Sequence, residues 1–260
     1  MSSKKRSSKK IVVIFCIFLA VFIFSATRFF SIYTALQKER GAFQSLAEMV
    51  ETPSAEISAQ IVENKYSEDG ILLKYKELYD LNPDAAGWIY VEDTEINYPV
   101  MFTPDEPDYY LYRSFDKASS GSGTPFLGEG CTPDSMSVLI HGHNMKNGTM
   151  FGSLEKYREV SFWETHPTFR FDTLREERTY EVIAAIKARA LREGEKGFPY
   201  YDFVGDLTEE AFDELLQGFK TAALYDTGVW ALYGDRLLML STCAYHHENG
   251  RFVVLAKEVS

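Results

Sequence analysis

A single uninterrupted apolar segment lies near the start of the chain. Residues 11–27 (IVVIFCIFLAVFIFSAT) contain no charged side chain, and five lysines and arginines precede them within residues 1–10. This length is at the lower limit for a helix that spans the hydrocarbon core of a bilayer. Because basic clusters stay on the cytoplasmic side, the pattern predicts a cytoplasmic tail at 1–10 and a transmembrane signal-anchor at 11–30. The rest of the chain is then expected outside the cell.

A cleaved signal peptide would show the same order of a basic and an apolar region. The apolar segment is longer than most signal-peptide cores, and Phe24 stands where a second small residue is expected beside Ser25 and Ala26. These features favour an uncleaved anchor. Both alternatives export the remainder of the chain.

Two helical patterns follow the anchor and predict a region of N-terminal helices over 31–84. Apolar residues recur at helical spacing over 31–50, and Pro53 ends that segment. A second apolar helix face is formed by Ile71, Leu72, Tyr75, Leu78 and Tyr79, and this pattern stops at the sequence Asn82-Pro83-Asp84. The two helices are predicted to lead into the main domain, 85–260.

Within this main domain the pattern changes to short β-rich runs separated by turn residues. The predicted strands are 87–91, 95–101, 124–127, 136–141, 168–172, 178–186, 236–242 and 251–257. Because they do not alternate regularly with helices, they predict a mainly β fold that closes, or nearly closes, into a barrel. One amphipathic helix interrupts them at 206–220, and Asp206 or Thr208 can cap its start.

Composition supports a folded domain and argues against nucleic-acid binding. Of the 260 residues, 45% are hydrophobic and 15% are aromatic, which is enough for a substantial core. The 27 Lys and Arg residues are outnumbered by 38 Asp and Glu residues. Because five of the basic residues lie in the tail, the rest of the chain is more acidic than the whole. Because such a surface repels phosphate and carries no Lys/Arg stripe, nucleic-acid binding is not expected.

The three cysteines are too few and too scattered for a disulfide framework or a zinc knuckle. Cys16, inside the apolar segment, is predicted to be an apolar filler. Export leaves open a disulfide between Cys131 and Cys243. Cys131, however, lies in a Gly/Pro loop, whereas Cys243 ends the apolar strand LLMLSTC and precedes two histidines. Cys131 is therefore expected to be incidental.

Cys243 lies where a buried strand is expected to emerge at the rim of the sheet. A thiol becomes a nucleophile as the thiolate, which needs cationic neighbours and access. In VLIHGHNM a strand is expected to end in His141-Gly142-His143, and imidazole is the usual proton shuttle near neutral pH. Arg251 follows the turn-forming Asn249-Gly250 and opens the strand RFVVLAK. Across a hairpin from the cysteine, it can hold a thiolate, a carbonyl or an oxyanion.

The same part of the sequence leaves a metal site open. His141 and His143, together with Cys243, His246 and His247, could bind zinc. Adjacent histidines in an extended segment point in different directions, so His246 and His247 are not expected to bind one ion together.

In combination these residues resemble the sortase family, and more closely its class B. The resemblance rests on LSTC at 240–243, the Gly-His of HGHNM and the arginine of GRFVVLAK, in the order His, Cys, Arg. It extends to GWIYVEDTEINYPVM, YYLYRSFDKASSGSGTPFL and NGTMFGSLEKY, and covers about residues 70–260. The chain departs from the family's TLxTC pattern at its first position, which is Met239.

The resemblance implies a sortase-type eight-stranded β-barrel with N-terminal helices and an inserted helix before the cysteine strand. It also implies a membrane-anchored cysteine transpeptidase on the exterior of a Gram-positive bacterium, without a metal or another cofactor. Its partners would be surface proteins that carry a C-terminal sorting motif, cleaved after Thr, and an acceptor amine of a peptidoglycan precursor or a pilin.

Roles for individual residues come from the same resemblance. Cys243 would form a thioacyl-enzyme, His143 would act as acid and then base, and Arg251 would steady the substrate carbonyl or the oxyanion. Ser241 and Thr242 would contact the sorting peptide. The second histidine, His141, is expected to pack or to form a hydrogen bond on the opposite strand face, and the family suggests no role for the later histidines.

Two other functions remain open at this point. The first is a catalytically inactive surface module that holds peptides in the same groove. The second is a zinc-dependent hydrolase.

Overall fold

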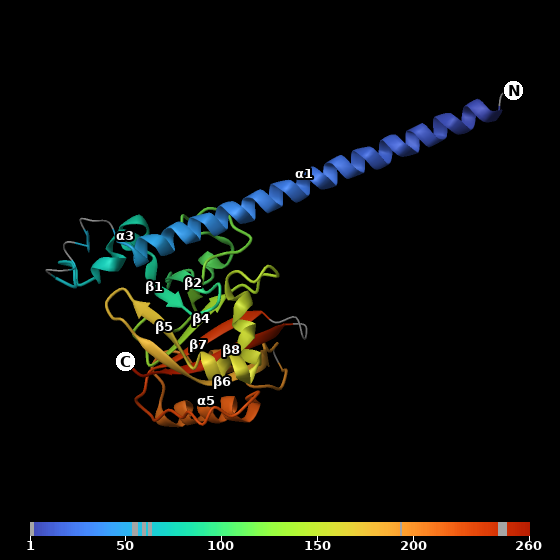
Figure 1. Cartoon of the computed structure of the whole chain (residues 1–260). Coiled ribbons are helices and arrows are strands. Elements are labelled where there is room, and N and C mark those ends of the chain that lie inside the picture. Colours follow the sequence, from blue (N-terminus) through green and yellow to red (C-terminus); the bar gives the residue numbers. More distant parts are fainter. Residues whose placement is uncertain (1–2, 54–56, 59–60, 62–63, 193, 244–248) are drawn as a thin grey trace. The chain divides into compact units, whose positions relative to one another are not determined.

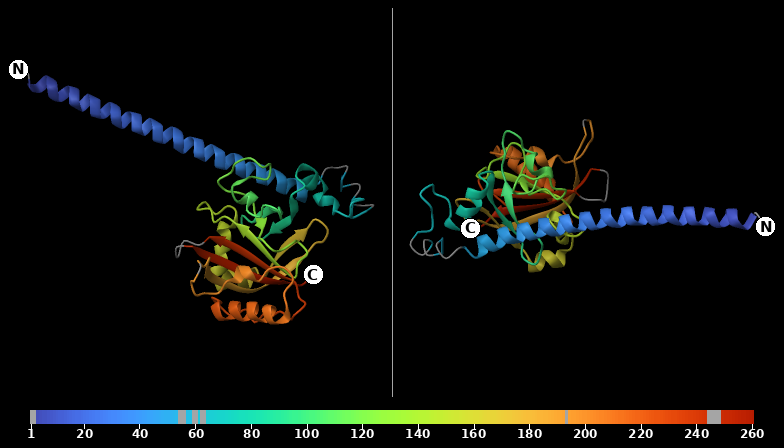
Figure 2. Two further views of the ribbon diagram at one scale, coloured as in Figure 1. Left: turned by 180° about the vertical axis from the view of Figure 1, so that it is seen from behind. Right: turned by 90° about the horizontal axis from the view of Figure 1, so that it is seen from above.

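The structure is a computed structural model that describes residues 3–53, 57–58, 61, 64–192, 194–243 and 249–260, with the backbone alone for 3–11. It consists of two compact units, Met1–Ser45 and Leu46–Ser260. Figures 1 and 2 show their secondary structure.

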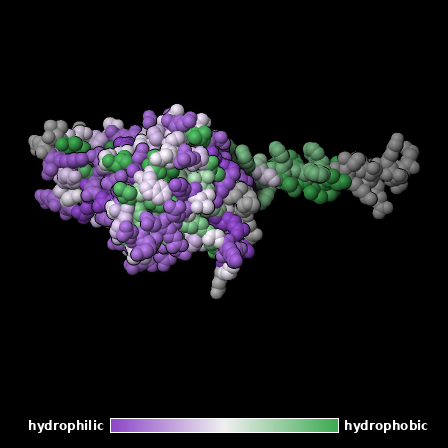
Figure 3. All heavy atoms as spheres, turned by 90° about the horizontal axis from the view of Figure 1, so that it is seen from below, coloured by the Kyte–Doolittle hydropathy of each residue, from purple (hydrophilic) through white to green (hydrophobic). Residues whose placement is uncertain are grey.

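The first unit is helical and belongs to one long helix, α1 (Ser3–Glu51), so the predicted anchor and the helix after it are continuous. Large apolar side chains along its described part are exposed, among them Phe18, Phe22 and Phe24. They cover the visible face of this part of the helix (Figure 3). The helix is long and apolar enough to cross a membrane, and it fits a single-pass anchor near the N-terminus.

Eight strands of the second unit form a closed barrel in the order β1-β2-β3-β4-β7-β8-β6-β5, which confirms the predicted mainly β fold. Two of the pairings, β2 with β3 and β4 with β7, are parallel. Every predicted strand overlaps an observed one. The bounds are β1 (Ala85–Tyr90), β2 (Asn97–Met101), β3 (Phe126–Leu127), β4 (Ser137–Gly142), β5 (Thr168–Thr173), β6 (Thr179–Arg189), β7 (Leu237–Cys243) and β8 (Gly250–Glu258).

Two predicted helices of this unit are confirmed, α3 (Leu73–Leu81) and the inserted helix α5 (Glu209–Ala222). Thr208 is the N-cap of α5, since its hydroxyl oxygen accepts a hydrogen bond from the amide of Ala211 at 3.3 Å. The sequence pattern did not predict four shorter elements: η1 (Tyr109–Tyr112), η2 (Phe151–Arg158), α4 (Val160–Thr165) and η3 (Tyr200–Asp202).

The inserted helix α5 lies along the outside of the barrel and packs on β6 (Figure 1). Its apolar face buries Phe212, Leu215, Leu216 and Phe219 against outward-facing residues of the barrel, such as Met239. Each such side chain stabilises the fold by about 1.5–3 kcal/mol when it is fully buried. The helix thereby holds β6, β7 and β8 from the outside.

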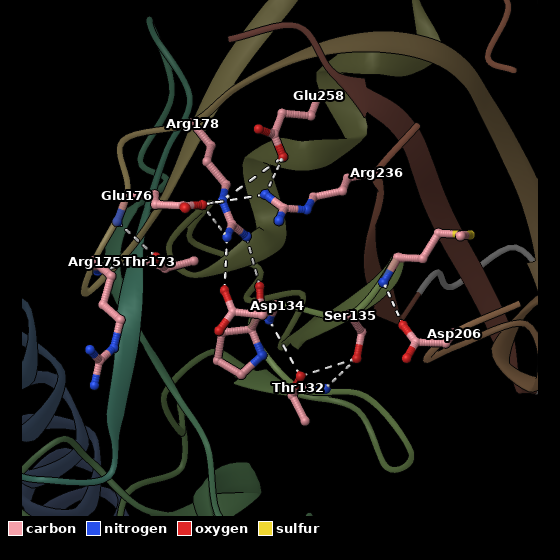
Figure 4. Close-up of polar contacts among 12 residues, drawn as sticks. Thr132, Asp134, Ser135, Thr173, Arg175, Glu176, Arg178, Asp206, Arg236 and Glu258 are labelled. Carbon is pink, nitrogen blue, oxygen red and sulfur yellow. Dashed lines mark hydrogen bonds and ion pairs between the residues drawn. The ribbon is translucent and has the colours of Figure 1, made fainter. Parts of the chain in front are cut away.

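A buried arginine ties several segments together at the end of the barrel where β7 begins (Figure 4). The Arg178 guanidinium donates to the carbonyl oxygen of Pro133 at 2.8 Å, to Asp134 at 2.8 Å and to Glu176 at 2.9 Å. Arg236 joins the same carboxylate of Glu176 at 3.3 Å. Charge-assisted bonds of this kind fix the end of the barrel that lies away from Cys243.

Helix α3 is attached to the barrel by a second polar cluster. The buried Tyr75 hydroxyl donates to Asp172 at 2.6 Å, and Lys74 bonds both Asp172 at 2.8 Å and Glu177 at 2.6 Å. Hydrogen bonds from Lys65 and Lys74 lower the pKa of Glu177 from 4.5 to about 2. The ionised form of Glu177 is therefore favoured in the folded protein.

Glu177→Gln is expected to make stability less sensitive to acid. Above pH 4.5 the carboxyl group is ionised in both states; between pH 4.5 and about 2 only the unfolded chain takes up the proton, so the free energy of unfolding falls. Urea unfolding at pH 7 and at about pH 3 should show a smaller loss in the variant than in the wild type. Glu164→Gln, at an exposed carboxylate, is the control, and an equal acid loss in Glu177→Gln would contradict the assignment.

Candidate active site

The three residues with implied catalytic roles lie at one end of three neighbouring strands. In the antiparallel pair of β7 and β8, Cys243 stands opposite Arg251. In the parallel pair of β4 and β7, Gly142 stands opposite Thr242, so the next residues are His143, directly after β4, and Cys243, the last residue of β7. The register therefore brings residues 143, 243 and 251 to the same end of β4, β7 and β8. These three strands can be followed in Figure 1.

The hairpin between β7 and β8 produces this pairing. Asn249, just before β8, has a φ of 57°, in the left-handed region that asparagine tolerates better than most residues. The predicted turn element Asn249-Gly250 is thus the place where the chain enters β8. Residues 244–248 lie outside the described residues, and the two later histidines, His246 and His247, are among them.

The main chain at Cys243 is fixed by a side chain from the end of β4. The Asn144 amide donates to the carbonyl oxygen of Cys243 at 2.7 Å and to the carboxylate of Glu155 at 3.0 Å. Arg158 in turn bonds Glu155 at 3.0 Å. Cys243 itself is half-buried and is a free thiol. Asn144 therefore links the strand that carries the histidine to the strand that carries the thiol.

His143, directly after β4, is contacted by the η1 turn. Its Nε2 atom lies 2.7 Å from the carbonyl oxygen of Leu111. The ring of Tyr112 lies beside the imidazole, with the ring centroids 5.4 Å apart and the planes inclined by 39°. The histidine is half-buried between these contacts.

Arg251 borders a pocket of about 550 Å³. Its guanidinium Nη1 donates to the carbonyl oxygen of Gly250 at 3.1 Å, which leaves further donors for a bound molecule. Tyr200 and Tyr201 contribute aromatic surface to the pocket, and its lining also includes three acidic residues, Asp108, Glu129 and Asp202. The described lining of the pocket therefore combines one cation with aromatic and acidic side chains, and it includes neither Cys243 nor His143.

His141 differs from the expectation that it lies on the opposite strand face. It lines the same pocket as Arg251, because residue 141 pairs with Ser241, two positions before Cys243, and side chains two apart share a strand face. Burial and the nearby Arg251 charge lower the pKa of His141 to about 4. At physiological pH it is a neutral imidazole.

Ser241 and Thr242 occupy different positions relative to this pocket. Ser241 shares the strand face of Cys243, is buried, and bonds the Tyr200 hydroxyl at 2.8 Å. Thr242 alternates with Cys243 and therefore faces the other side, where its hydroxyl donates to the carbonyl oxygen of Gly142 at 2.7 Å. Of the two, only Ser241 is placed near the wall of the pocket.

The cysteines and the metal alternative can also be assessed within the described residues. Cys131 is a buried free thiol 3.3 Å from the carbonyl oxygen of Gly128, so it is not bonded to Cys243, and burial raises its pKa. No group of three or more His, Cys, Asp or Glu side chains in the described part of the chain is arranged to hold a metal ion.

Three contributors to the site were missed by the sequence reasoning: Leu111, Asn144 and Tyr200. Asn144 follows His143 directly in the HGHNM motif, so its position was a usable signal. Leu111 acts through a main-chain carbonyl, which no residue type reveals. Tyr200 is in a segment whose short η3 turn has no recognisable period.

The chain resembles known proteins in both sequence and fold. No family model matches the chain. The chain is 32% identical to sortase B of Listeria monocytogenes over 189 residues, 71% of this chain and 74% of that protein. It is 28% identical to sortase B of Staphylococcus aureus over 202 residues, which are 76% of this chain and 79% of that protein. The crystal structure of Bacillus anthracis sortase B in complex with AAEK1 superposes with a TM-score of 0.72 at 27% identity, covering 88% of this chain and 99% of that one.

Proposed function

The chain belongs to the sortase B family and is thus a cysteine transpeptidase, and from this premise we propose that it is a membrane-anchored enzyme that attaches surface proteins to an extracellular amine. Its substrates would be proteins that carry a C-terminal sorting motif, cut after Thr. The acceptor would be a peptidoglycan precursor or a pilin. The observation that carries the proposal is the strand register that sets Cys243 opposite Arg251, with His143 at the end of the next strand.

In the first half-reaction, the thiolate of Cys243 attacks the carbonyl carbon of the motif threonine. A carbon–sulfur bond forms, and the carbonyl oxygen becomes an oxyanion that faces the guanidinium of Arg251. The scissile carbon–nitrogen bond then breaks. The departing amine takes a proton from the imidazolium of His143, which leaves a thioacyl-enzyme.

In the second half-reaction, the acceptor amine attacks the thioester carbon. His143 takes the proton that the amine loses, and the oxyanion again faces Arg251. The carbon–sulfur bond breaks as the new amide forms. The thiolate and imidazolium are thereby restored, so no metal or redox partner is needed to balance the reaction.

In this proposal the N-terminal anchor determines where the protein lies in the cell. Helix α1 would cross the cell membrane once with the basic tail in the cytoplasm, and the catalytic unit would lie outside. Surface proteins and cell-wall amines are also found there. The apolar N-terminal helix supports this arrangement through its length and composition.

The full-length protein in detergent micelles, incubated with labelled sorting-motif peptides and an amine, is expected to join the N-terminal part of one peptide class to the amine. The physical reason is that a thioester retains enough energy to acylate an amine. Chromatography with mass detection measures the product.

Two outcomes of this assay would favour the other functions. Peptide binding without any covalent product would indicate the inactive binding module. Cleavage that stops when a chelator is added, and resumes with zinc, would indicate the metal-dependent hydrolase.

A further inference from the structure

The contact between His143 and Leu111 determines where the imidazole carries its proton. The Nε2 atom lies 2.7 Å from the Leu111 carbonyl oxygen. A carbonyl oxygen has no hydrogen to donate, so Nε2 must be the donor, and the other nitrogen, Nδ1, is unprotonated in the neutral ring.

We propose that the Leu111 carbonyl is the positioning group that sets His143 in the Nε2–H tautomer and so assigns proton transfer to Nδ1. The inference rests on the proposed transpeptidase function. In acylation, the Nδ1–H bond breaks and its proton goes to the departing amine. In deacylation, the acceptor amine returns a proton to Nδ1. The Nε2–H bond is retained in both steps, as in triads whose third member orients the histidine.

The η1 turn that presents this carbonyl is firmly anchored. Tyr110 is fully buried, its hydroxyl donates to Asp84 at 2.7 Å, and it accepts a hydrogen bond from the amide of Asn82 at 2.8 Å. The Leu111 amide donates to the carbonyl oxygen of Asp108 at 2.9 Å. These bonds hold the main chain that leads up to the Leu111 carbonyl.

Gly123 is the residue against which the carbonyl rests. A Cβ atom at this position would lie 2.4 Å from the Leu111 oxygen and 2.8 Å from the Tyr110 oxygen. Both are main-chain atoms, so neither can swing aside as the end of a long side chain would. Gly123 also has a φ of 59°, which side chains rarely adopt. A larger residue therefore forces a shift at the contact between residue 123 and the main chain of Tyr110 and Leu111.

The ring of Tyr112 supports the same orientation from another side. Its centroid is 5.4 Å from that of His143, and the tyrosine side chain is itself 61% exposed. The aromatic face and the carbonyl together restrict rotation of the imidazole. With Nε2 bonded to the carbonyl, Nδ1 is the nitrogen that can exchange a proton.

The tautomer can be measured directly in the wild-type protein. Full-length protein labelled with ¹⁵N-histidine in detergent micelles is examined by long-range proton–nitrogen correlation, and His143→Gln identifies the resonance. The expected result is the Nε2–H pattern for the neutral ring. The Nδ1–H pattern would overturn the proposal, whether or not any variant folds.

Two glycines of the same loop provide a matched pair for activity. Gly123→Ala is expected to lower kcat by about 10²-fold with KM little changed, and to mix the two tautomers, because small displacements of a catalytic group have effects of this size. Gly121→Ala should match the wild type, since a Cβ there meets no atom within 4 Å. A folded Gly123→Ala protein that mixes the two tautomers and keeps the wild-type kcat would also contradict the proposal.

Failure of this inference can be distinguished from failure of the proposed function. The tautomer is read without peptide or amine. A pure Nε2–H ring in a protein that transfers nothing would refute the transpeptidase and leave the tautomer assignment intact. Transfer by a protein with an Nδ1–H ring would refute the tautomer assignment and leave the transpeptidase function intact.

Discussion

Cys243→Ala is expected to abolish transfer of a sorting-motif peptide to an amine, with a loss of about 10⁴-fold or more. Without the sulfur there is no atom to hold the acyl group, and the reaction cannot be divided into its two half-reactions. Product formation is measured with full-length protein in micelles. Circular dichroism confirms that the variant remains folded.

Cys131→Ala is the matched control for this substitution. The Cys131 thiol is buried and bonded within its own loop, so its removal should leave transfer close to the wild-type rate. Substantial transfer by Cys243→Ala, or a comparable loss in both variants, would show that the thiol at the end of β7 is not the nucleophile.

Arg251→Ala is expected to lower kcat by about 10²–10³-fold, the usual effect of losing one donor to a developing oxyanion. Arg251→Lys should recover only part of this loss, because an ammonium group keeps the charge without the planar fork. Single-turnover acylation kinetics would locate the defect in the chemical step. Since Arg251 is the second cause of the lowered His141 pKa, the alanine variant should also raise that pKa above about 4.

Arg236→Ala is the control for the loss of one positive charge without the loss of Arg251. Arg236 precedes β7 at the other end of the strand and bonds Glu176, so its loss removes one positive charge away from Cys243. Transfer should be unchanged. A similar fall in both arginine variants would mean that net charge, rather than the position of Arg251, governs the rate.

The strands could be predicted from the sequence because each is a short apolar run bounded by turn residues. Residues 237–243 are almost wholly buried, and their sequence LLMLSTC shows this directly. Helix α5 was predictable for a related reason, since its apolar spacing spans several turns. The turns η1, η2 and η3 and the six-residue α4 could not be predicted, because such short elements complete too few periods.

The residue types of the proposed site came from the sequence, and their arrangement could be anticipated only in part. The resemblance suggested His143, Cys243 and Arg251, and the short separation of Cys243 from Arg251 in a hairpin explains why their pairing could be anticipated. The strand face that His141 occupies could not be anticipated, because it depends on the register between β4 and β7. Alternation along β7 alone could have placed Thr242 on the face away from Cys243.

The Leu111 carbonyl illustrates a different limit. It reaches His143 because the η1 turn, Gly123 and the end of β4 meet in space, although they are separate in sequence. A main-chain group can be contributed by any residue type, so no motif indicates it. Only the tertiary structure shows that this turn is part of the site.

The central claim is that Cys243 carries the acyl group between two amines. The most direct measurement is the mass of full-length protein incubated with a sorting-motif peptide and no acceptor, followed by proteolysis to locate any adduct. The account predicts a thioester on Cys243 that disappears when the amine is added and never forms in Cys243→Ala. An adduct on another residue, or turnover by Cys243→Ala, would contradict it.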